Sequence, residues 1–161
     1  MKLKTNVSFR QYLKLLFGLA YEKPVLRLLL GLAGLVILWI VLHALDLFNL
    51  PEPQIYQYIT LLLILIIQPL AIFYTIRRNY YSSNYLMETL QMELTKNDVK
   101  ITGETFYMEI LWSKVYRVDE RTNWFMIYTN NLSAIIIPKN DLTEAQKTQV
   151  REIVKAVPTK K

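Results

Sequence analysis

The sequence predicts a membrane α+β protein. An N-terminal amphipathic helix comes first, then a two-helix transmembrane hairpin, and finally a small antiparallel β-domain closed by a C-terminal helix. Three observations predict this fold class: two apolar runs long enough to cross a bilayer, a series of short alternating segments after them, and an amphipathic segment at the end. The chain has 161 residues, of which 53% are hydrophobic, so it can hold one soluble domain besides its membrane segments.

Residues 1–23 predict the amphipathic helix, which we place on the cytoplasmic side. Its apolar side chains recur at helical spacing at Phe9, Tyr12, Leu13, Leu16 and Phe17. Ser8 precedes them and is suited to cap the helix. The apolar stripe can lie on the inner leaflet of a membrane or pack on the soluble domain, and the sequence leaves both interpretations open.

Residues 24–78 predict the transmembrane hairpin. Its spans cover about 25–45 and 55–76, and 46–54 form the external loop. About 20 apolar residues in a helix cross a hydrocarbon core of about 30 Å, and each run reaches that length. A cleaved signal peptide is the competing interpretation of the first run. That run is too long and lacks a clear cleavage motif, so we expect it to remain as an anchor.

The charges around the hairpin predict its orientation. The loop carries Asp46 and Glu52 without any Lys or Arg, whereas basic residues precede the first span and follow the second. Basic residues favour the cytoplasmic side, so both chain ends are expected in the cytoplasm. The residues expected to anchor the spans at the membrane interface are Arg27, Arg77, Arg78, Tyr74 and Tyr80.

Residues 79–161 predict the β-domain. Alternating segments and intervening turns give six short strands in a meander, beginning at the LQMELT segment and ending at SAIIIP. The final segment has one apolar stripe. Asp141 with Glu144 has capping-box spacing, and Thr143 is an alternative cap. A single helix that covers one end of such a meander is typical of a pleckstrin-homology-like (PH-like) domain.

The arrangement also resembles a family, the YcxB-like bacterial membrane proteins. The residues that carry the resemblance are Trp112, Val115, Val118, Phe125, Ile127, Tyr128, Ile136, Ile137, Pro138 and Lys139. The resemblance implies a PH-like domain on a membrane hairpin in the bacterial cytoplasmic (inner) membrane. It implies no catalytic residues, because the family has no established activity.

The composition excludes several classes of function. The chain has no cysteine, which removes disulfides, thiolate nucleophiles and cysteine-ligated metals. Its one histidine, His43, lies in a span, and no serine or threonine has an evident partnered base. Residues 79–161 carry eleven basic and ten acidic side chains, which argues against a nucleic-acid surface. We therefore expect no catalytic site, metal or cofactor, and no nucleic-acid partner.

The sequence hypothesis is a non-enzymatic, membrane-anchored binding or adaptor protein with a protein partner. The candidate binding rim consists of four basic residues, Lys114, Arg117, Arg121 and Lys139. If this rim faces the bilayer, the protein is instead a sensor of anionic lipid headgroups. A small transport or immunity-type subunit acting through His43 and Gln68 is a third hypothesis. Self-association is left open.

Overall fold

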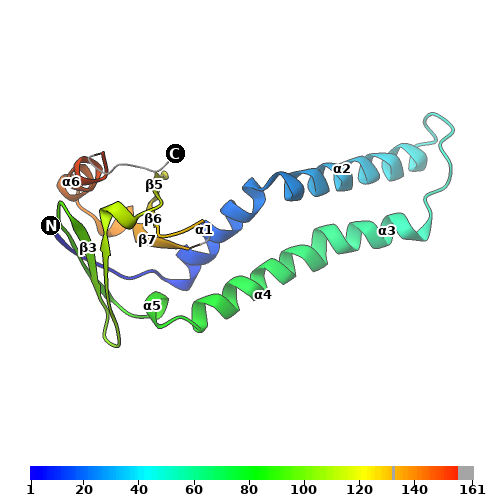
Figure 1. Cartoon of the computed structure of the whole chain (residues 1–161). Coiled ribbons are helices and arrows are strands. Elements are labelled where there is room, and N and C mark those ends of the chain that lie inside the picture. Colours follow the sequence, from blue (N-terminus) through cyan, green and yellow to red (C-terminus); the bar gives the residue numbers. More distant parts are fainter. Residues whose placement is uncertain (132, 156–161) are drawn as a thin grey trace. The chain divides into compact units, whose positions relative to one another are not determined.

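The computed structural model describes residues 1–131 and 133–155 (Figure 1). The chain divides into two compact units. One is helical and comprises Phe9–Tyr80, and the other is mainly β and comprises Met1–Ser8 together with Tyr81–Lys161. The end of the predicted β-domain, residues 156–161, lies outside the described residues.

The helical unit contains two apolar helices preceded by an amphipathic one. Its elements are α1 (Phe9–Glu22), α2 (Pro24–Ala44), α3 (Ile55–Leu62), the π-helical segment η1 (Leu63–Ile67) and α4 (Gln68–Tyr81). Pro24 stands in the first turn of α2, where a missing N–H costs nothing. α3, η1 and α4 follow one another without a break over 27 residues, and α2 has 21 residues. Both are long and apolar enough to cross a membrane.

The π-helical segment lies just before a proline inside the second apolar helix. Pro69 has no N–H to give to the carbonyl four residues earlier, and its ring would crowd that carbonyl. The backbone N–H of Gln68 bonds to the carbonyl of Leu63, five residues back. The helix therefore accommodates Pro69 by a local widening at η1.

Neither the small nor the polar residues of the spans join α2 to the second apolar helix. A Cβ built on Gly31 or Gly34 meets no atom of another element within 4 Å. Both amide atoms of Gln68 are buried and have no hydrogen-bond partner among the described residues.

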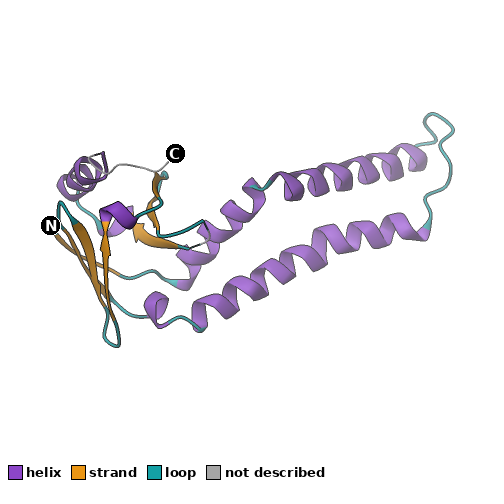
Figure 2. Ribbon diagram, viewed as in Figure 1, coloured by secondary structure: helices purple, strands orange, loops and turns teal. Residues whose placement is uncertain are grey.

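The β unit contains two antiparallel sheets (Figure 2). The first has the order β1-β2-β3-β4, from Lys2–Thr5, Leu90–Leu94, Asp98–Thr102 and Tyr107–Leu111. The second has the order β5-β6-β7, from Arg117–Glu120, Trp124–Tyr128 and Ala134–Pro138. The helix α6 (Glu144–Lys155) follows the second sheet. The predicted antiparallel sheets and C-terminal helix are thus present.

The strand β1 was not predicted, because residues 1–23 were assigned to a single helix. Lys2 lies opposite Glu93 and Thr5 lies opposite Leu90, so β1 forms the outer strand of the first sheet. The side chain of Leu3 is buried, while those of Lys2 and Lys4 are exposed. β1 and β2 are therefore neighbours in the sheet, although the whole helical unit lies between them in the sequence.

Three local details of the β unit also differ from the prediction. The segment that starts at Trp112 opens as a 3₁₀ turn, η2 (Trp112–Lys114), before β5 begins. A short helix, α5 (Asn84–Met87), precedes β2. α6 is capped by the alternative residue Thr143, whose hydroxyl accepts from the N–H of Gln146 at 3.3 Å.

The core lies between the two sheets and α6. The side chains that form it are Leu3, Leu90, Met92, Leu94, Val99, Ile101, Trp112, Val115, Phe125, Ile127, Ile135, Ile137, Leu142 and Val150. The indole N–H of Trp112 donates to the carbonyl of Thr95 at 2.9 Å, which satisfies its buried polar atom. Val150 is the residue by which α6 enters this core, because it is fully buried. Burial on one face of the first sheet leaves its other face for polar residues.

Candidate functional site

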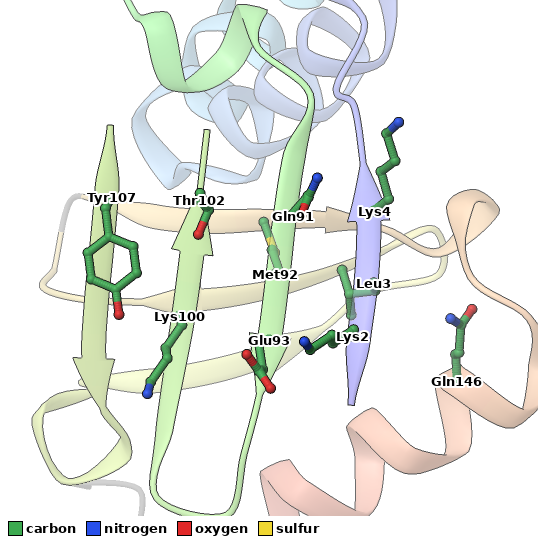
Figure 3. Close-up of a pocket in the computed structure, with 10 residues that line it drawn as sticks. All are labelled: Lys2, Leu3, Lys4, Gln91, Met92, Glu93, Lys100, Thr102, Tyr107 and Gln146. Carbon is green, nitrogen blue, oxygen red and sulfur yellow. The ribbon is translucent and has the colours of Figure 1, made fainter. Parts of the chain in front are cut away.

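A hollow of about 470 Å³ lies on the polar face of the first sheet (Figure 3). The residues that line it come from all four strands of that sheet and from α6: Lys2, Leu3, Lys4, Gln91, Met92, Glu93, Lys100, Thr102, Tyr107 and Gln146. A smaller hollow of about 190 Å³ shares Lys4, Gln91 and Thr102 with the first. The two hollows form one continuous surface, which we call the sheet groove.

The strand period places the polar lining side chains of the strands on one face, whereas Leu3 and Met92 belong to the core on the other. In β2, Leu90, Met92 and Leu94 are buried, so Gln91 and Glu93 point to the opposite side. The antiparallel register then aligns residues of neighbouring strands into rows that cross the sheet. Two such rows make up most of the sheet groove.

The first row alternates in charge from strand to strand. Lys2 lies opposite Glu93, Glu93 opposite Lys100, and Lys100 opposite Glu109. The Nζ atom of Lys100 lies 3.8 Å from a carboxylate oxygen of Asp98 and 3.9 Å from one of Glu109. Asp98, and after it Glu109, raise the pKa of the Lys100 ammonium, so its positive charge is firmly held.

The second row is mostly uncharged. Lys4 lies opposite Gln91, Gln91 opposite Thr102, and Thr102 opposite Tyr107. The hydroxyl of Tyr107 donates to Glu109 at 2.8 Å, and this bond raises the pKa of the phenol. The row therefore supplies amide and hydroxyl groups that both donate and accept hydrogen bonds.

At one end of the sheet groove, the carboxylate of Glu88 fixes the backbone by hydrogen bonds. It accepts hydrogen bonds from the N–H of Thr105 at 3.0 Å and from the Thr105 hydroxyl, and it also accepts from the N–H of Glu104. The hydrogen bonds with Thr105, and then that with Glu104, lower the pKa of Glu88. This fixes the β3–β4 turn beside Gly103, which lines the smaller hollow.

The chemistry that the sheet groove offers is binding. It presents charges of both signs with amides and hydroxyls. In residues 1–131 and 133–155, no group of three or more His, Asp or Glu residues is arranged to hold a metal ion. The groove is open and crosses several strands, which suits an extended polar ligand.

The structure does not bring the predicted basic rim together. Lys114 is exposed in η2, and Arg117 pairs with Asp119 at 3.4 Å and lies over the ring of Tyr128. Arg121 follows the far end of β5, about 13 Å along the strand from Arg117. Lys139 is buried, which contradicts its assignment to an exposed rim.

Lys139 instead belongs to an ion-pair cluster that joins β5, η3 (Lys139–Asp141) and α6. Its Nζ atom lies 2.6 Å from an oxygen of Glu120 and 4.8 Å from the centre of the Phe125 ring. Arg151 of α6 donates to the same carboxylate at 2.8 Å. These contacts give Lys139 a structural role.

Of the five predicted membrane anchors, four have exposed side chains and one is buried. Arg27, Arg77, Arg78 and Tyr74 have exposed side chains in the helical unit. Tyr80 is buried, and its ring packs at 5.3 Å from that of Phe9 and 5.6 Å from that of Tyr12. Tyr80 therefore contributes to the packing of α1 on α4 and is not an exposed interfacial residue.

Sequence reasoning missed the sheet groove. Its residues are ordinary polar side chains, and Lys2 and Lys4 join the others only through the pairing of β1 with β2, which was not predicted. The signal that could have found it is the alternation Lys-Leu-Lys-Thr at residues 2–5, which places two lysines on one face of a strand.

The fold defines a class of protein, an antiparallel two-sheet domain with a C-terminal helix. In the sequence, a pair of long apolar helices is inserted between the first two strands of this domain. A family model described as YcxB-like protein matches residues 94–154. Over this segment the chain is similar to the YcxB-like family, which confirms the resemblance read from the sequence. No curated protein and no solved structure matches the chain.

Proposed function

We propose that this protein is a non-enzymatic membrane anchor for a PH-like domain, which binds a partner protein at the cytoplasmic surface of the bacterial inner membrane. The observation that carries the proposal is the sheet groove, an open surface of mixed charge on a domain tethered to two apolar helices. A groove of this kind matches the alternating polar groups of an extended polypeptide.

The strand arrangement supports the PH-like assignment. Four strands form one antiparallel sheet in sequence order, three form the second, and a helix follows and enters the core through Val150. Antiparallel sheets followed by a helix that packs on them are the features that support this assignment. The helical insertion lies between β1 and β2 and leaves both sheets intact.

The helical unit supports insertion into a membrane. α2 and the second apolar helix have mean hydropathies of 2.6 and 2.4, and most of their large apolar side chains are exposed. Such a surface is costly in water and is covered in a bilayer. Since β1 pairs with β2, the two ends of the insertion must lie on one side of any membrane that it crosses. The basic residues at both ends favour the cytoplasmic side.

The charge of the sheet groove favours a protein over a lipid headgroup. Lys2, Lys4 and Lys100 face it, but Glu93 and Glu109 alternate with them in the rows. An anionic headgroup needs an excess of positive charge, and the four residues of the predicted rim are not assembled into one site. A polypeptide can match both signs.

The proposal is tested by filling the groove. The variant Gln91→Arg with Thr102→Arg places two large side chains on the polar face, where both native side chains are exposed. The matched control is Gln149→Arg on the exposed side of α6. Tagged full-length proteins are purified from native membranes, and their bound proteins and lipids are identified by mass spectrometry.

A protein that is retained by the wild type and by the Gln149→Arg control, but lost from the groove variant, supports the proposal. If an anionic lipid is enriched by the wild type and no protein is, the headgroup-sensor function replaces it. That outcome also predicts binding that weakens strongly with salt, because headgroup attraction is screened over about 10 Å at 0.1 M salt.

A further inference from the structure

The two sheets of the β unit have four edge strands, β1, β4, β5 and β7. An edge strand presents unpaired N–H and C=O groups, to which another chain can add as a further strand. Proteins usually block such edges with prolines, charges, short strands or covering groups. The four edges of this domain differ in how far they are blocked.

The edge of β7 is closed along most of its length. The N–H of Thr129 donates to the carbonyl of Ser133, and the N–H of Lys139 donates to the carbonyl of Asn123. These bonds show which alternate residues of β7 pair with β6. The backbone groups of the others, Ala134, Ile136 and Pro138, point outward. Pro138 has no N–H, and the N–H of Ile136 donates to the hydroxyl of Tyr85 at 3.2 Å.

The edges of β1 and β5 are short and charged. β1 has four residues with two exposed lysines, and the next outward N–H, that of Asn6, donates to Asp141 at 3.3 Å. β5 also has four residues, and its outward positions are Val118 and Glu120. The carboxylate of Glu120 is held by Arg151 of α6.

The edge of β4 is open. The N–H of Trp112 bonds to Asn97 and the N–H of Gly103 bonds to Phe106, so the backbones of alternate residues of β4 are paired with β3. The outward backbones are therefore those of Tyr107, Glu109 and Leu111. No strand pairs with them in the part of the chain that the structure describes. Tyr107 is 60% exposed and Leu111 is 49% exposed.

The side chains of β4 define what can pair with this edge. Glu109 ends the alternating row of Lys2, Glu93 and Lys100, so the next position across the sheet calls for a positive charge. On the other face, Met108 and Ile110 pack against the core but stay partly exposed. Apolar neighbours on an added strand would cover them.

We propose that the edge of β4 binds an extended segment of the partner protein as a fifth strand of the first sheet, with a Lys or Arg opposite Glu109 between two apolar residues. This inference rests on the proposed function and names the chemistry of its partner. The apolar residues cover Met108 and Ile110, and the cation completes the charge row.

A second copy of this chain is a poorer occupant than such a segment. The longest antiparallel pairing of β4 with itself centres on Glu109 and places two Glu109 carboxylates opposite each other. Like charges in directly opposite positions destabilise a strand pair. Registers shifted by two residues separate the carboxylates but shorten the pairing.

The test uses a synthetic peptide with blocked ends, Gly-Ser-Thr-Val-Lys-Val-Thr-Ser-Gly, and a counterpart with Glu at its centre. The palindromic sequence places the same side chains opposite β4 in either strand direction. Full-length protein in nanodiscs is titrated with each peptide, and backbone amide exchange is followed by NMR. We expect the Lys peptide to slow exchange at Tyr107, Glu109 and Leu111, and to bind about fivefold more tightly than the Glu peptide.

Two variants and a control sharpen the test. Glu109→Lys should reverse the preference between the peptides. Glu109→Pro should abolish binding while the domain stays folded, because the outward N–H that it removes has no partner within the sheet. Ala134→Pro is the matched control, since it removes an outward N–H at the edge of β7, outside the sheet groove, and should leave peptide binding unchanged.

Protection elsewhere, or binding that survives Glu109→Pro, would overturn the inference. So would concentration-dependent self-association of the wild type that Glu109→Pro abolishes, because the edge would then hold a second copy. If the native partner is lost on filling the sheet groove but retained by Glu109→Pro, the edge inference fails while the proposed function stands. If the wild type retains no protein, the proposed function itself fails.

Discussion

Replacing Glu120 by alanine should destabilise the β unit through the loss of a partner for a buried cation. The Glu120 carboxylate lies between Lys139, at 2.6 Å, and Arg151, at 2.8 Å. The side chain of Lys139 is only 10% exposed, so its ammonium cannot regain full hydration when the carboxylate is removed. The ring of Phe125, with its centre 4.8 Å from the Lys139 Nζ atom, does not replace the lost carboxylate.

The size of the effect lies between two limits. Breaking a fully buried pair costs about 3–5 kcal/mol, whereas a pair exposed to water contributes about 0–1 kcal/mol. The side chain of Glu120 is 39% exposed, whereas that of Lys139 is only 10% exposed. We therefore expect Glu120→Ala to lower the free energy of unfolding by about 2 kcal/mol. Arg151→Ala should cost less than about 1 kcal/mol, because Arg151 is 41% exposed.

The same cluster should make stability depend on pH. The pKa of Glu120 is lowered, first by its hydrogen bond with Arg151 and then by that with Lys139. A carboxyl group with a lowered folded pKa adds stability above its unfolded value, near 4.5, and this contribution is lost as the pH falls through the folded pKa. The difference between wild type and Glu120→Ala should therefore shrink in acid.

The assay is urea unfolding in nanodiscs, followed by tryptophan fluorescence in a Trp39→Phe background, because the other two tryptophans, Trp112 and Trp124, lie in the β unit. Adding Lys139→Met to Glu120→Ala removes the unpaired ammonium and should restore about 1 kcal/mol or more. A loss below about 0.5 kcal/mol for Glu120→Ala, or no recovery in the double variant, would refute this reasoning.

Three further predictions concern the β unit. Leu3→Ala should cost about 2–4 kcal/mol in urea unfolding, because Leu3 is a buried core residue of β1, and an unchanged transition would show that β1 is not part of the domain. Trp112→Phe should cost about 1–3 kcal/mol by circular dichroism, since it leaves the carbonyl of Thr95 without its indole donor; a neutral result would contradict that bond. Gly103→Ala should lower the melting temperature, with a cost of about 1–3 kcal/mol, because a Cβ there overlaps the ring of Phe106, and tolerance would mean that the turn relaxes freely.

The parts of the fold that could be predicted from the sequence depend on local patterns. The two apolar helices follow from their length and hydropathy, and β2 to β7 follow from alternation and turns. The strand β1 was missed because an alternation over four residues is a weak signal, and its partner β2 follows in the sequence only after the helical unit. Pairing between distant segments, and not local propensity, decides its structure.

The site was harder to predict than the fold for a related reason. Lys139 was assigned to a binding rim because its sequence neighbours do not reveal Glu120 or Arg151, which lie on other elements. Tyr80 was assigned to the membrane interface because tyrosines near span ends commonly lie there, but Phe9 and Tyr12 bury it. A side chain's role in such a site depends on its tertiary neighbours.

The insertion of the helical unit between β1 and β2 also sets an order of events during synthesis. β1 leaves the ribosome before the helical unit and cannot pair until β2 has been made, after both apolar helices. Until then β1 has no partner, which is a state prone to aggregation and proteolysis. If the two apolar helices cross a membrane, as we propose, a second helix that did not return to the first side would keep β1 and β2 apart permanently. Completion of the first sheet then requires that both ends of the helical unit lie on one side of the membrane.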